Sequence, residues 1–393
     1  MGEWKNCTLS SLGTIVGGAT PSTKKPENYE GGEIPWITPK DLSGFSGRYI
    51  SCGERNITEI GLKNCSAQMM PKHSVLFSSR APIGYVAISN CDVCTNQGFK
   101  SIVPNNDTDY LFLYYLLLYK KHEIENLGSG TTFKEVSAST MKGVEVRVPI
   151  DKREQERIAG ILSALDDKIE SNAHINENLE QQISSIYANL CENKSWNSCE
   201  LGSLIEVRDG THDSPKPQSD GYLLVTSKHL LPYGVDRITP NRIAEKDFKK
   251  INERSLVEPG DVLMSMIGTI GLISFVADQT IDYAIKNVAL FKTSKTPELA
   301  YYFLTFLKSK KTQQYIEMCL AGSTQKYISL GELRKMPIPD PAVETLESFN
   351  KIVRPMYQTI ILNTQENNAF AELRDSLLPK LISGDLDISE IDI

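Results

Sequence analysis

The sequence predicts an α+β protein in which two pseudo-symmetric lobes of mixed α/β structure are separated by two long antiparallel coiled-coil helices. Two observations lead to this fold. The 393-residue chain repeats itself in the order lobe, helix, lobe, helix. Its helical segments carry seam residues at alternating spacings of four and three, which is typical of a coiled coil. The length also favours two or three cored units, because single domains usually hold roughly 100 to 200 residues.

The first segment, residues 1–150, is expected to form the first lobe. It mixes short apolar runs with turns rich in glycine and proline, which predicts strands and short helices. Its most apolar stretch, residues 110–119, lies between Asp109 and Lys120. This stretch predicts a buried helix, since a membrane span needs roughly 18 uninterrupted apolar residues. No other part of the chain approaches that length, and we expect no contact with a membrane.

The second segment, residues 151–194, is expected to be a helix of about 40 residues and hence roughly 60 Å long. Its ten seam positions are Ile158, Leu162, Leu165, Ile169, Asn172, Asn176, Leu179, Ile183, Ile186 and Leu190. An apolar seam of this length must pack against a partner in water. The helix is therefore expected to pair with the other long helix and to act as a spacer.

The third segment, residues 195–341, repeats landmarks of the first and is expected to form the second lobe. Residues 74–84 resemble 260–271, and the apolar stretch at 111–118 has a counterpart at 299–307. Near the end of each lobe, 130–134 matches 322–326. Two equivalent lobes on an antiparallel helix pair imply pseudo-twofold symmetry, which a DNA duplex shares.

The fourth segment, residues 342–393, is expected to hold the second long helix and a C-terminal tail. Its seam positions follow the first seam at a constant offset of 191: Phe349, Val353, Met356, Ile360, Asn363, Asn367, Phe370, Arg374, Leu377 and Leu381. Pro355 breaks the equivalence of the two helical segments, because proline cannot donate a backbone hydrogen bond. A kink or a late helix start is expected near it.

Each helical segment carries two asparagines near its middle. Asn172 and Asn176 lie in the first, and Asn363 and Asn367 lie in the second. If the helices pack antiparallel and in register, the four side chains form a polar layer, which costs stability but fixes register and orientation. The alternative is that they lie just beside the seam, in solvent.

The charge distribution permits DNA binding although the net charge is -7. The acidic excess lies in the helical segments, where 151–194 holds 5 basic and 9 acidic residues and 342–393 holds 4 and 9. The two lobes hold 15 against 14 and 18 against 17, so each is close to neutral. Their many cations are therefore available to line a groove.

The sequence predicts no catalytic residues, no metal site and no cofactor bound by this chain. It lacks a phosphate-binding Gly-x4-Gly-Lys-Ser/Thr, the Asn-Pro-Pro-Tyr of adenine methyltransferases and a Gly-x-Gly-x-x-Gly. Cys91 and Cys94 form a Cys-x-x-Cys without a second ligand pair, so the cysteines are expected to be free thiols. The loop 209–213 holds one histidine beside two acids, which favours a hydrogen-bonded turn over a metal site. The charged N-terminus lacks a secretory pattern, and we expect a cytoplasmic protein.

Several segments then carry a specific resemblance. They are residues 12–22, Ile-Pro-Trp-Ile-Thr-Pro-Lys-Asp-Leu at 34–42, 154–159, 223–230 and Leu-Leu-Pro-Lys-Leu-Ile-Ser-Gly at 377–384. Over its whole length the chain is similar to the specificity subunit of type I restriction-modification enzymes.

The resemblance implies a non-catalytic subunit with two target-recognition domains, 1–150 and 195–341, and two conserved helical spacers. Such a subunit binds double-stranded DNA at a bipartite target, each lobe recognising one half-site. It directs two modification subunits to this target, and these methylate adenine with S-adenosylmethionine. In the full complex it also directs restriction subunits, which use ATP and Mg²⁺. A role in phage defence follows from this resemblance.

Candidate DNA contacts are loop residues able to reach base edges or phosphates. In the first lobe they are Thr38, Lys40, Ser78, Ser79, Arg80, Asn96, Gln97, Ser129, Thr131, Thr132 and Lys134. In the second lobe they are Thr226, Ser227, Lys228, Ser265, Met266, Thr269, Lys286, Asn287, Ser323, Thr324, Gln325 and Lys326. A lone Ser or Thr in such a loop often only caps a turn, whereas Arg80, Gln97, Lys228 and Lys326 favour DNA contact.

Two other classes of function stay open at this point. An enzyme with unfamiliar motifs would be active in isolation with a cofactor or metal. A scaffold of two lobes on a coiled coil would bind only protein and would fit the acidic net charge. The lobe loops, rich in Lys, Arg, Asn and Gln, argue against the scaffold.

Overall fold

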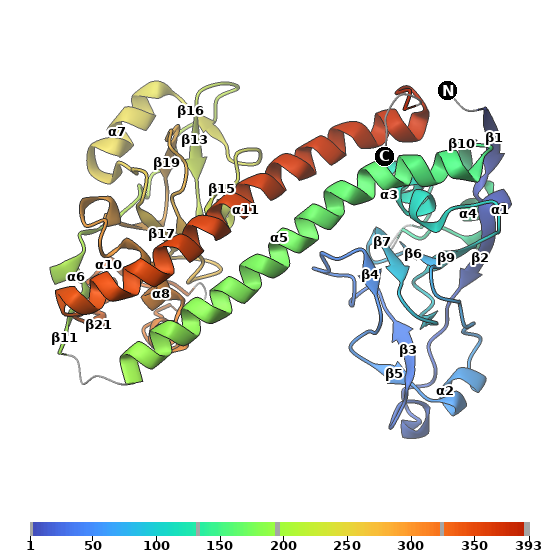
Figure 1. Ribbon diagram of the computed structural model, residues 1–393, viewed down its shortest axis with the longest axis horizontal. Coiled ribbons are helices and arrows are strands. Elements are labelled where there is room, and N and C mark those ends of the chain that lie inside the picture. The colour runs from blue at the N-terminus through green and yellow to red at the C-terminus, as the bar shows by residue number, and fades with distance from the viewer. Residues whose placement is uncertain (1–2, 131–133, 193–196, 323–325, 389–393) are drawn as a thin grey trace. The chain divides into compact units, whose positions relative to one another are not determined.

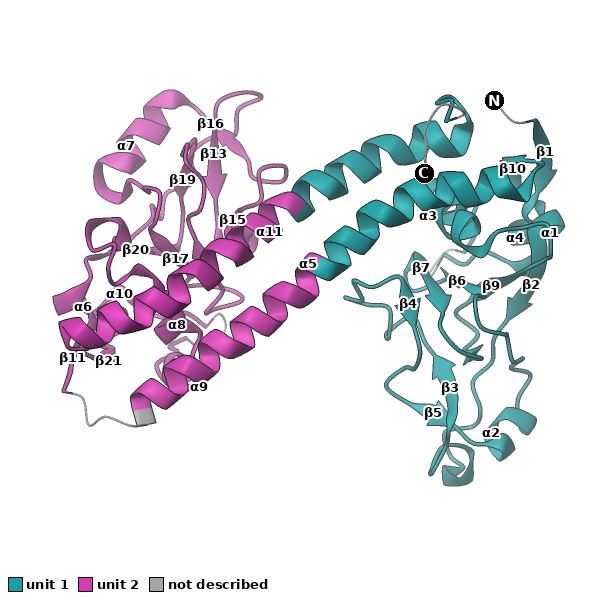
Figure 2. Cartoon of the chain, in the orientation of Figure 1, with its two compact units in different colours: residues 1–171, 367–393 teal, residues 172–366 magenta. Residues whose placement is uncertain are grey.

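The computed structural model describes residues 3–130, 134–192, 197–322 and 326–388. The chain forms two compact units (Figure 2). Unit 1 holds residues 1–171 and 367–393, and unit 2 holds residues 172–366. Each unit consists of one lobe together with part of both long helices, α5 (Lys152–Glu192) and α11 (Val343–Ser383). The lobe of unit 1 is called lobe 1 and that of unit 2 is called lobe 2.

Within its described residues, lobe 1 contains three β-sheets. The largest has the strand order β2-β9-β6-β7-β4, a smaller one has the order β5-β3-β8, and β1 pairs with β10. The strands are β1 (Trp4–Thr8), β2 (Gly13–Gly17), β3 (Ile34–Ile37), β4 (Tyr49–Ile50), β5 (Asn56–Ile57), β6 (Val75–Ser79), β7 (Ile83–Ser89), β8 (Cys94–Thr95), β9 (Lys100–Pro104) and β10 (Glu145–Pro149). The helices are α1 (Leu9–Leu12), α2 (Glu59–Lys63), α3 (Tyr110–Asn126) and α4 (Ala138–Gly143), with a short 3-10 turn at Pro26–Asn28.

Lobe 2 contains sheets in the orders β12-β20-β17-β18 and β16-β13-β19, and the pairs β14-β15 and β11-β21. The strands are β11 (Ser198–Glu200), β12 (Val207–Asp209), β13 (Tyr222–Val225), β14 (Leu230–Leu231), β15 (Gly234–Val235), β16 (Arg242–Ile243), β17 (Val262–Ser265), β18 (Ile273–Phe275), β19 (Tyr283–Ile285), β20 (Val288–Phe291) and β21 (Pro337–Pro339). The helices are α6 (Leu201–Leu204), α7 (Glu245–Ser255), α8 (Ala300–Lys308), α9 (Lys310–Met318) and α10 (Leu330–Lys335), with 3-10 turns η2 (Ser227–His229) and η3 (Thr293–Lys295).

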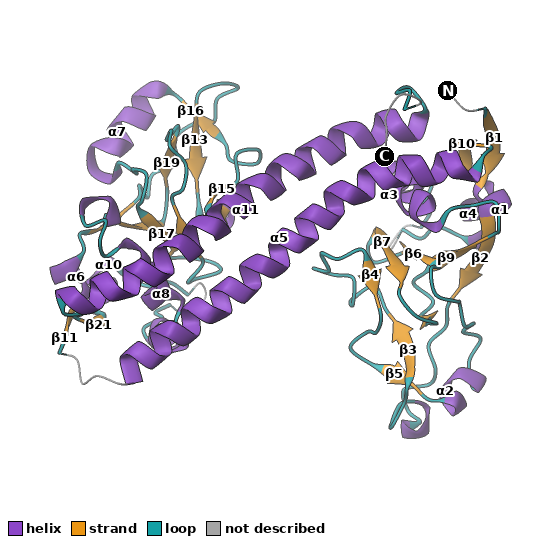
Figure 3. Cartoon of the chain, in the orientation of Figure 1, coloured by secondary structure: helices purple, strands orange, loops and turns teal. Residues whose placement is uncertain are grey.

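The two lobes share one topology, which confirms the predicted internal repeat. The order β2-β9-β6-β7 corresponds to β12-β20-β17-β18, and β5-β3-β8 corresponds to β16-β13-β19. In both small sheets the central strand runs antiparallel to one neighbour and parallel to the other. Figures 1 and 3 show the strands gathered in the lobes and the long helices crossing each unit.

The predicted buried helices form the core of each lobe. In α3 the apolar residues from Phe112 to Leu117 are buried under the large sheet, and Asp109 caps the helix by accepting a hydrogen bond from the Phe112 N–H (2.7 Å). In lobe 2 the equivalent apolar stretch lies in α8, which is buried over nearly its whole length. Ser309 ends α8 and caps α9, so lobe 2 has two helices where lobe 1 has one.

The long helices confirm the predicted seam. All twenty seam positions are buried or half-buried, because within each unit the two helices pack against each other and against the lobe. They run antiparallel within each unit. In unit 1, Asp166 of α5 pairs with Arg374 of α11. Ile169, which comes later in α5, accepts through its carbonyl from Asn367, which comes earlier in α11. Of the two outcomes expected at Pro355, the late helix start is wrong, since α11 begins at Val343, and the kink stays a prediction.

Within the described residues, no helix is both long and apolar enough to cross a membrane.

Candidate nucleic-acid interface

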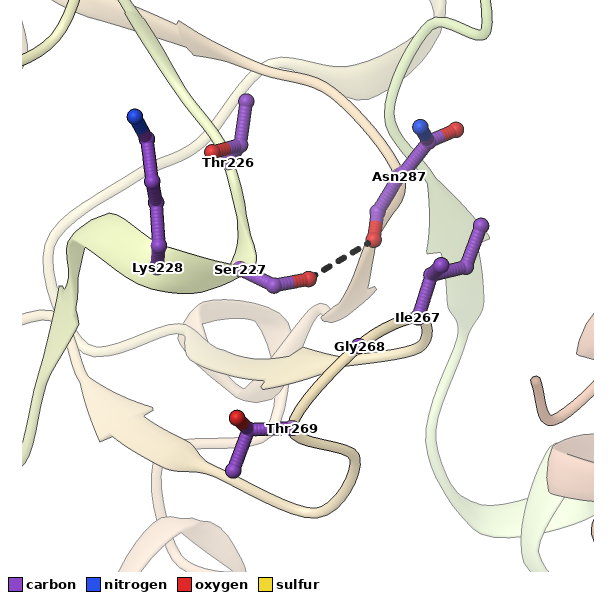
Figure 4. A pocket seen from close by; sticks show the side chains of 7 residues that line it. All are labelled: Thr226, Ser227, Lys228, Ile267, Gly268, Thr269 and Asn287. Atoms are coloured by element: carbon purple, nitrogen blue, oxygen red, sulfur yellow. Dashed lines mark hydrogen bonds between the residues drawn. The ribbon is translucent and has the colours of Figure 1, made fainter. Parts of the chain in front are cut away.

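Three loops of lobe 2 meet around an open pocket of about 360 Å³. One loop follows β13, one joins β17 to β18, and one follows β19 (Figure 4). The pocket is lined by Thr226, Ser227, Lys228, Ile267, Gly268, Thr269 and Asn287. All of these except Ile267 and Gly268 are residues that the sequence predicted as DNA contacts. The fold therefore brings together predicted contacts that lie as much as 61 positions apart in the chain.

The loop after β13 is held by a buried histidine. The Thr226 N–H donates to His229 Nδ1 (3.0 Å), and the His229 ring is only 3% exposed. Burial, assisted by the neighbouring charge of Lys228, lowers the pKa of His229, so the ring is neutral and able to accept this hydrogen bond. The capped turn leaves Lys228 exposed, and no hydrogen bond or ion pair joins its ammonium group to another described residue. Lys228 is thus a cation that is available to a phosphate.

Asn287 occupies the opposite rim of this pocket in an unusual backbone conformation. Its φ is +53°, in the left-handed region that asparagine tolerates better than most residues. Its N–H donates to the Thr211 carbonyl (3.1 Å), and its own carbonyl accepts a long hydrogen bond from the Ser227 hydroxyl (3.5 Å). These contacts fix the backbone, and Figure 4 shows the side-chain amide projecting from the rim.

Lobe 1 builds the same turn after β3. The N–H of Thr38 donates to the carboxylate of Asp41 (2.7 Å), which takes the place of the histidine cap. Lys40 is exposed like Lys228, but its ammonium lies 2.6 Å from Glu54. Pairs between exposed charges contribute little stability, so Lys40 can leave Glu54 at low cost.

The residues after β8 and β19 correspond as well. The Asn96 N–H donates to the last carbonyl of β3 (3.0 Å), and the Lys286 N–H donates to the last carbonyl of β13 (2.8 Å). Asn96 therefore matches Lys286, and Gln97 matches Asn287. The Asn96 side chain caps its own turn, accepting from the Gly98 N–H (2.8 Å), whereas Gln97 is exposed. The Lys286 ammonium donates to the Ser214 hydroxyl.

Four predicted contacts are corrected by their burial. Ser78, Ser79 and Ser265 are fully buried, and Met266 is 6% exposed. The hydroxyls of Ser78 and Ser265 donate to the carbonyl four residues later, at 2.8 and 2.6 Å, and thereby close the turns after β6 and β17. These side chains have no surface to offer a base, so we assign them to positioning the turns.

The remaining predicted residues lie in the β6–β7 turn and the loop after α3 of lobe 1, and in the loop after α9 of lobe 2. Arg80 is one-third exposed and lies 3.5 Å from Glu135, which Lys100 also approaches (3.3 Å). Ser129, Lys134 and Lys326 are exposed. Five predicted contacts lie outside the described residues: Thr131, Thr132, Ser323, Thr324 and Gln325.

Asn287 is supported by a series of hydrogen-bonded side chains that were not predicted from the sequence. His212 Nδ1 lies 2.8 Å from Asn287 Oδ1, and His212 Nε2 lies 3.1 Å from the carboxylate of Asp209. Asp209 is buried and is paired on its other oxygen with Arg254. The expected hydrogen-bonded turn at 209–213 is present, and its histidine contacts a predicted DNA-binding residue. His212 also borders a second pocket of about 350 Å³, lined by Thr211, His212, Asp213, Ser214, Pro215, Asp247, Lys250, Ile251, Arg254 and Ser255.

The equivalent residue in lobe 1 is Thr20. Its hydroxyl donates to Gln97 Oε1, although the two residues are 77 positions apart. Thr20 and His212 each stand two residues after a glycine, Gly18 or Gly210. A Cβ on these glycines would lie 2.1 and 2.3 Å from the carbonyl oxygen at the end of β8 or β19. The two glycines, aligned through the repeat, are the signal in the sequence that could have revealed both residues.

The four asparagines of the predicted polar layer lie close to the boundary between the two units, at 171/172 in α5 and 366/367 in α11. In unit 2, the Asn363 amide donates to Asn176 Oδ1 (2.8 Å), and the Asn172 amide lies 3.2 Å from a glutamate of α11. In unit 1, the Asn367 amide donates to a backbone carbonyl of α5 (3.2 Å). All four side chains are half-buried. Their contribution to register stays a prediction.

The part of the chain that the structure describes contains no group of three or more His, Cys, Asp or Glu residues able to hold a metal ion. Burial raises the pKa of the Cys94 thiol to about 12.

Comparisons with known proteins agree with this architecture. The family model of the type I restriction modification DNA specificity domain matches residues 1–181 and again 193–371. The MjaIX specificity subunit of Methanocaldococcus jannaschii is 34% identical, over 99% of this chain and 95% of its own length. The EcoR124I/EcoR124II specificity subunit of Escherichia coli is 30% identical over 46% of this chain and 44% of its own.

A solved structure shares the fold. The S subunit of the type I restriction-modification system of M. genitalium superposes with a TM-score of 0.61 at 18% identity, covering 97% of this chain and 96% of that one. The two matches of the family model coincide with the repeat seen in the topology. The chain therefore belongs to the family of type I restriction-modification DNA specificity subunits, the non-catalytic subunits that recognise the DNA target.

Proposed function

We propose that each lobe recognises one half of a bipartite double-stranded DNA target. The observation that carries this proposal is the recurrence of one site in both lobes. After matching strands, each lobe presents an exposed lysine, Lys40 or Lys228, and an amide, Gln97 or Asn287. Ammonium groups neutralise phosphates, and amides form hydrogen bonds with base edges, so the pair supplies both kinds of contact that specific binding needs.

We further propose that the chain directs two modification subunits and, in the full complex, restriction subunits. The internal repeat supports the number two, since each half of the chain offers an equivalent surface to a partner. On this proposal S-adenosylmethionine is bound by the modification subunits, and ATP and Mg²⁺ by the restriction subunits. This chain would bind none of the three.

The test is methylome sequencing of a methylation-free host that expresses this chain with its neighbouring modification subunit, repeated without this chain. A split asymmetric adenine motif that needs both proteins is the expected result. Exchanging residues 1–150 for those of a relative should then alter one half of the motif only. If the complex assembles and binds S-adenosylmethionine but no motif appears, the scaffold function replaces this one.

Single residues are tested on the purified complex with its cognate duplex. Lys228→Ala should weaken binding to all sequences alike and reduce the slope of log affinity against log salt by about one, as expected for one lost phosphate contact. Lys246→Ala, which removes a cation of α7 outside the pocket, is the matched control. Equal effects of the two substitutions would contradict a specific place for Lys228.

A further inference from the structure

A side-chain amide presents two different ends to DNA. Its oxygen accepts hydrogen bonds and its NH₂ donates them, and rotation by half a turn exchanges the two. An unrestrained Asn or Gln can therefore bind adenine with two bonds, accepting from N6 and donating to N7. A residue that holds one end in place decides what the other end can recognise.

In lobe 2 the amide oxygen of Asn287 is held. His212 Nδ1 approaches Oδ1 at 2.8 Å, and no hydrogen bond joins the Asn287 NH₂ to another described residue. His212 is itself oriented by Asp209 at 3.1 Å, and Arg254 pairs with the second oxygen of this carboxylate. Asp209 is 5% exposed and lies at the end of β12. The series of hydrogen-bonded side chains that orients the His212 ring therefore begins on a rigid strand.

In lobe 1 the amide oxygen of Gln97 is held by different chemistry. The Thr20 hydroxyl donates to Oε1, and again no hydrogen bond joins the NH₂ to another described residue. Both lobes thus use the residue two positions after a close-packed glycine, Gly18 or Gly210, to hold the same end of the amide. An imidazole and a hydroxyl differ in size and shape, but both can donate to the amide oxygen, which indicates that holding this oxygen is the common purpose.

We propose that Thr20 and His212 are positioning residues that make Gln97 and Asn287 present only their NH₂ groups to the major groove. This inference rests on the proposed function of the lobes. A single donor recognises the acceptors of guanine, adenine or thymine and rejects cytosine, which offers only a donor there. Each lobe therefore excludes cytosine at one position of its half-site, and the restrained amide does not form the two-bond contact with adenine.

The experiment measures binding of the full chain, in complex with its modification subunit, to duplexes that carry every single-base replacement of the motif. Thr20→Val removes the hydroxyl without changing the side-chain volume, and Thr20→Ser keeps it. Thr20→Val should reduce the preference against cytosine at one position of one half-site about tenfold, the discrimination of about one hydrogen bond to a base. Thr20→Ser should bind as the wild type does.

In lobe 2, His212→Leu should produce the same loss in the other half-site, and His212→Asn, which retains a donor near the place of Nδ1, should restore most of it. Asn287→Gly removes the amide and suits the positive φ of this position. The double variant His212→Leu with Asn287→Gly should discriminate no less than Asn287→Gly alone, because the histidine acts through the amide. The melting temperature of each variant is measured alongside, so that a loss of folding is distinguished from a loss of base preference.

The outcomes separate this inference from the proposed function. If the complex of the wild-type chain with its modification subunit methylates no split motif, the proposed function fails. If the wild type recognises a split motif but Thr20→Val and His212→Leu leave every base preference unchanged, the positioning role is refuted and the function stands. The positioning role is also refuted if base discrimination falls equally at all positions of the motif. It is likewise refuted if the loss in His212→Leu adds fully to the loss in Asn287→Gly, because a merely structural role would produce these patterns.

Discussion

Replacing Arg48 by Met should lower the free energy of unfolding of unit 1 by about 2 kcal/mol. Arg48 belongs to lobe 1, and its guanidinium contacts Asp167 and Glu170 of α5. Burial alone would lower its pKa, but the hydrogen bonds to Glu170 and Asp167 outweigh burial and raise the pKa above its ordinary value. The folded state therefore keeps the charge, and the ion pairs hold the lobe on the helix.

The magnitude follows from the unequal exposure of the partners. The Arg48 side chain is 5% exposed, that of Glu170 33% and that of Asp167 65%. Removing one partner of a fully buried pair costs about 3 to 5 kcal/mol, whereas an exposed pair contributes at most about 1 kcal/mol. Water can hydrate both carboxylates once the guanidinium is gone, so the loss falls between these limits. Lys at this position keeps the charge but loses the planar fork, and about half of the loss should remain.

Tryptophan fluorescence during urea unfolding measures this change. The chain has three tryptophans, and a Trp196→Phe background leaves only Trp4 and Trp36, which both lie in unit 1. Lys40→Met is the matched control, because the pair of Lys40 with Glu54 is 78% and 70% exposed. The reasoning is refuted if Arg48→Met shifts the unfolding midpoint of unit 1 no more than Lys40→Met does.

Three other changes test the interior of lobe 2 and the contact of lobe 2 with α5. Lys292→Met leaves the fully buried Asp261 without its partner at 2.6 Å and should cost unit 2 about 3 to 5 kcal/mol, measured as a lowered melting temperature. Burial alone would raise the pKa of Glu180, but Lys308 lowers it below the ordinary value. The stabilisation that this ion pair contributes is complete above the unfolded pKa of Glu180 and is lost as pH falls through its lower folded pKa. The difference in unfolding midpoint between wild type and Glu180→Gln should therefore begin to shrink as pH falls below the unfolded pKa of about 4.3 and should disappear below the lower folded pKa. Gly210→Ala places a Cβ 2.3 Å from a carbonyl oxygen and should destabilise lobe 2 by about 1 to 3 kcal/mol in urea unfolding, whereas Gly260→Ala, with open space around it, should show only the smaller strain of its positive φ.

The long helices and the repeat could be predicted from the sequence because their signals are regular and local. A seam such as Ile158 to Leu190 repeats every turn of one continuous helix, so each position supports the next. The sheets could not be assigned in this way. Strands such as Tyr49–Ile50 and Cys94–Thr95 hold two residues each, too few for a period, and their partners lie far along the chain.

The candidate site shows the same limit. Loop residues with the right chemistry could be recognised, as for Lys228 and Asn287, because exposure and residue type coincide there. Ser78 and Ser265 have the same chemistry but lie at or next to the last residue of a buried strand, and only the fold shows this. The contact between His212 and Asn287 joins positions 75 residues apart, which no local pattern can reveal.

The lobes share a topology, but they are attached to the helices by different chemistry. In unit 1, Asp166 of α5 accepts from the Tyr115 hydroxyl of lobe 1 (2.6 Å) and pairs with Arg374 of α11 (2.6 Å). The offset of 191 places Tyr357 where Asp166 stands, and Tyr357 contacts Thr305 of lobe 2 (3.0 Å). Arg374 likewise stands where the first helix has a buried isoleucine. A helix carboxylate that accepts from a tyrosine of lobe 1 and a helix tyrosine that contacts a threonine of lobe 2 disfavour exchange of the two lobes, because each lobe would lose the hydrogen bond that it forms with its own helix segment. The repeat thus fixes the shape of each unit, and the departures from it fix which lobe occupies which end of each helix.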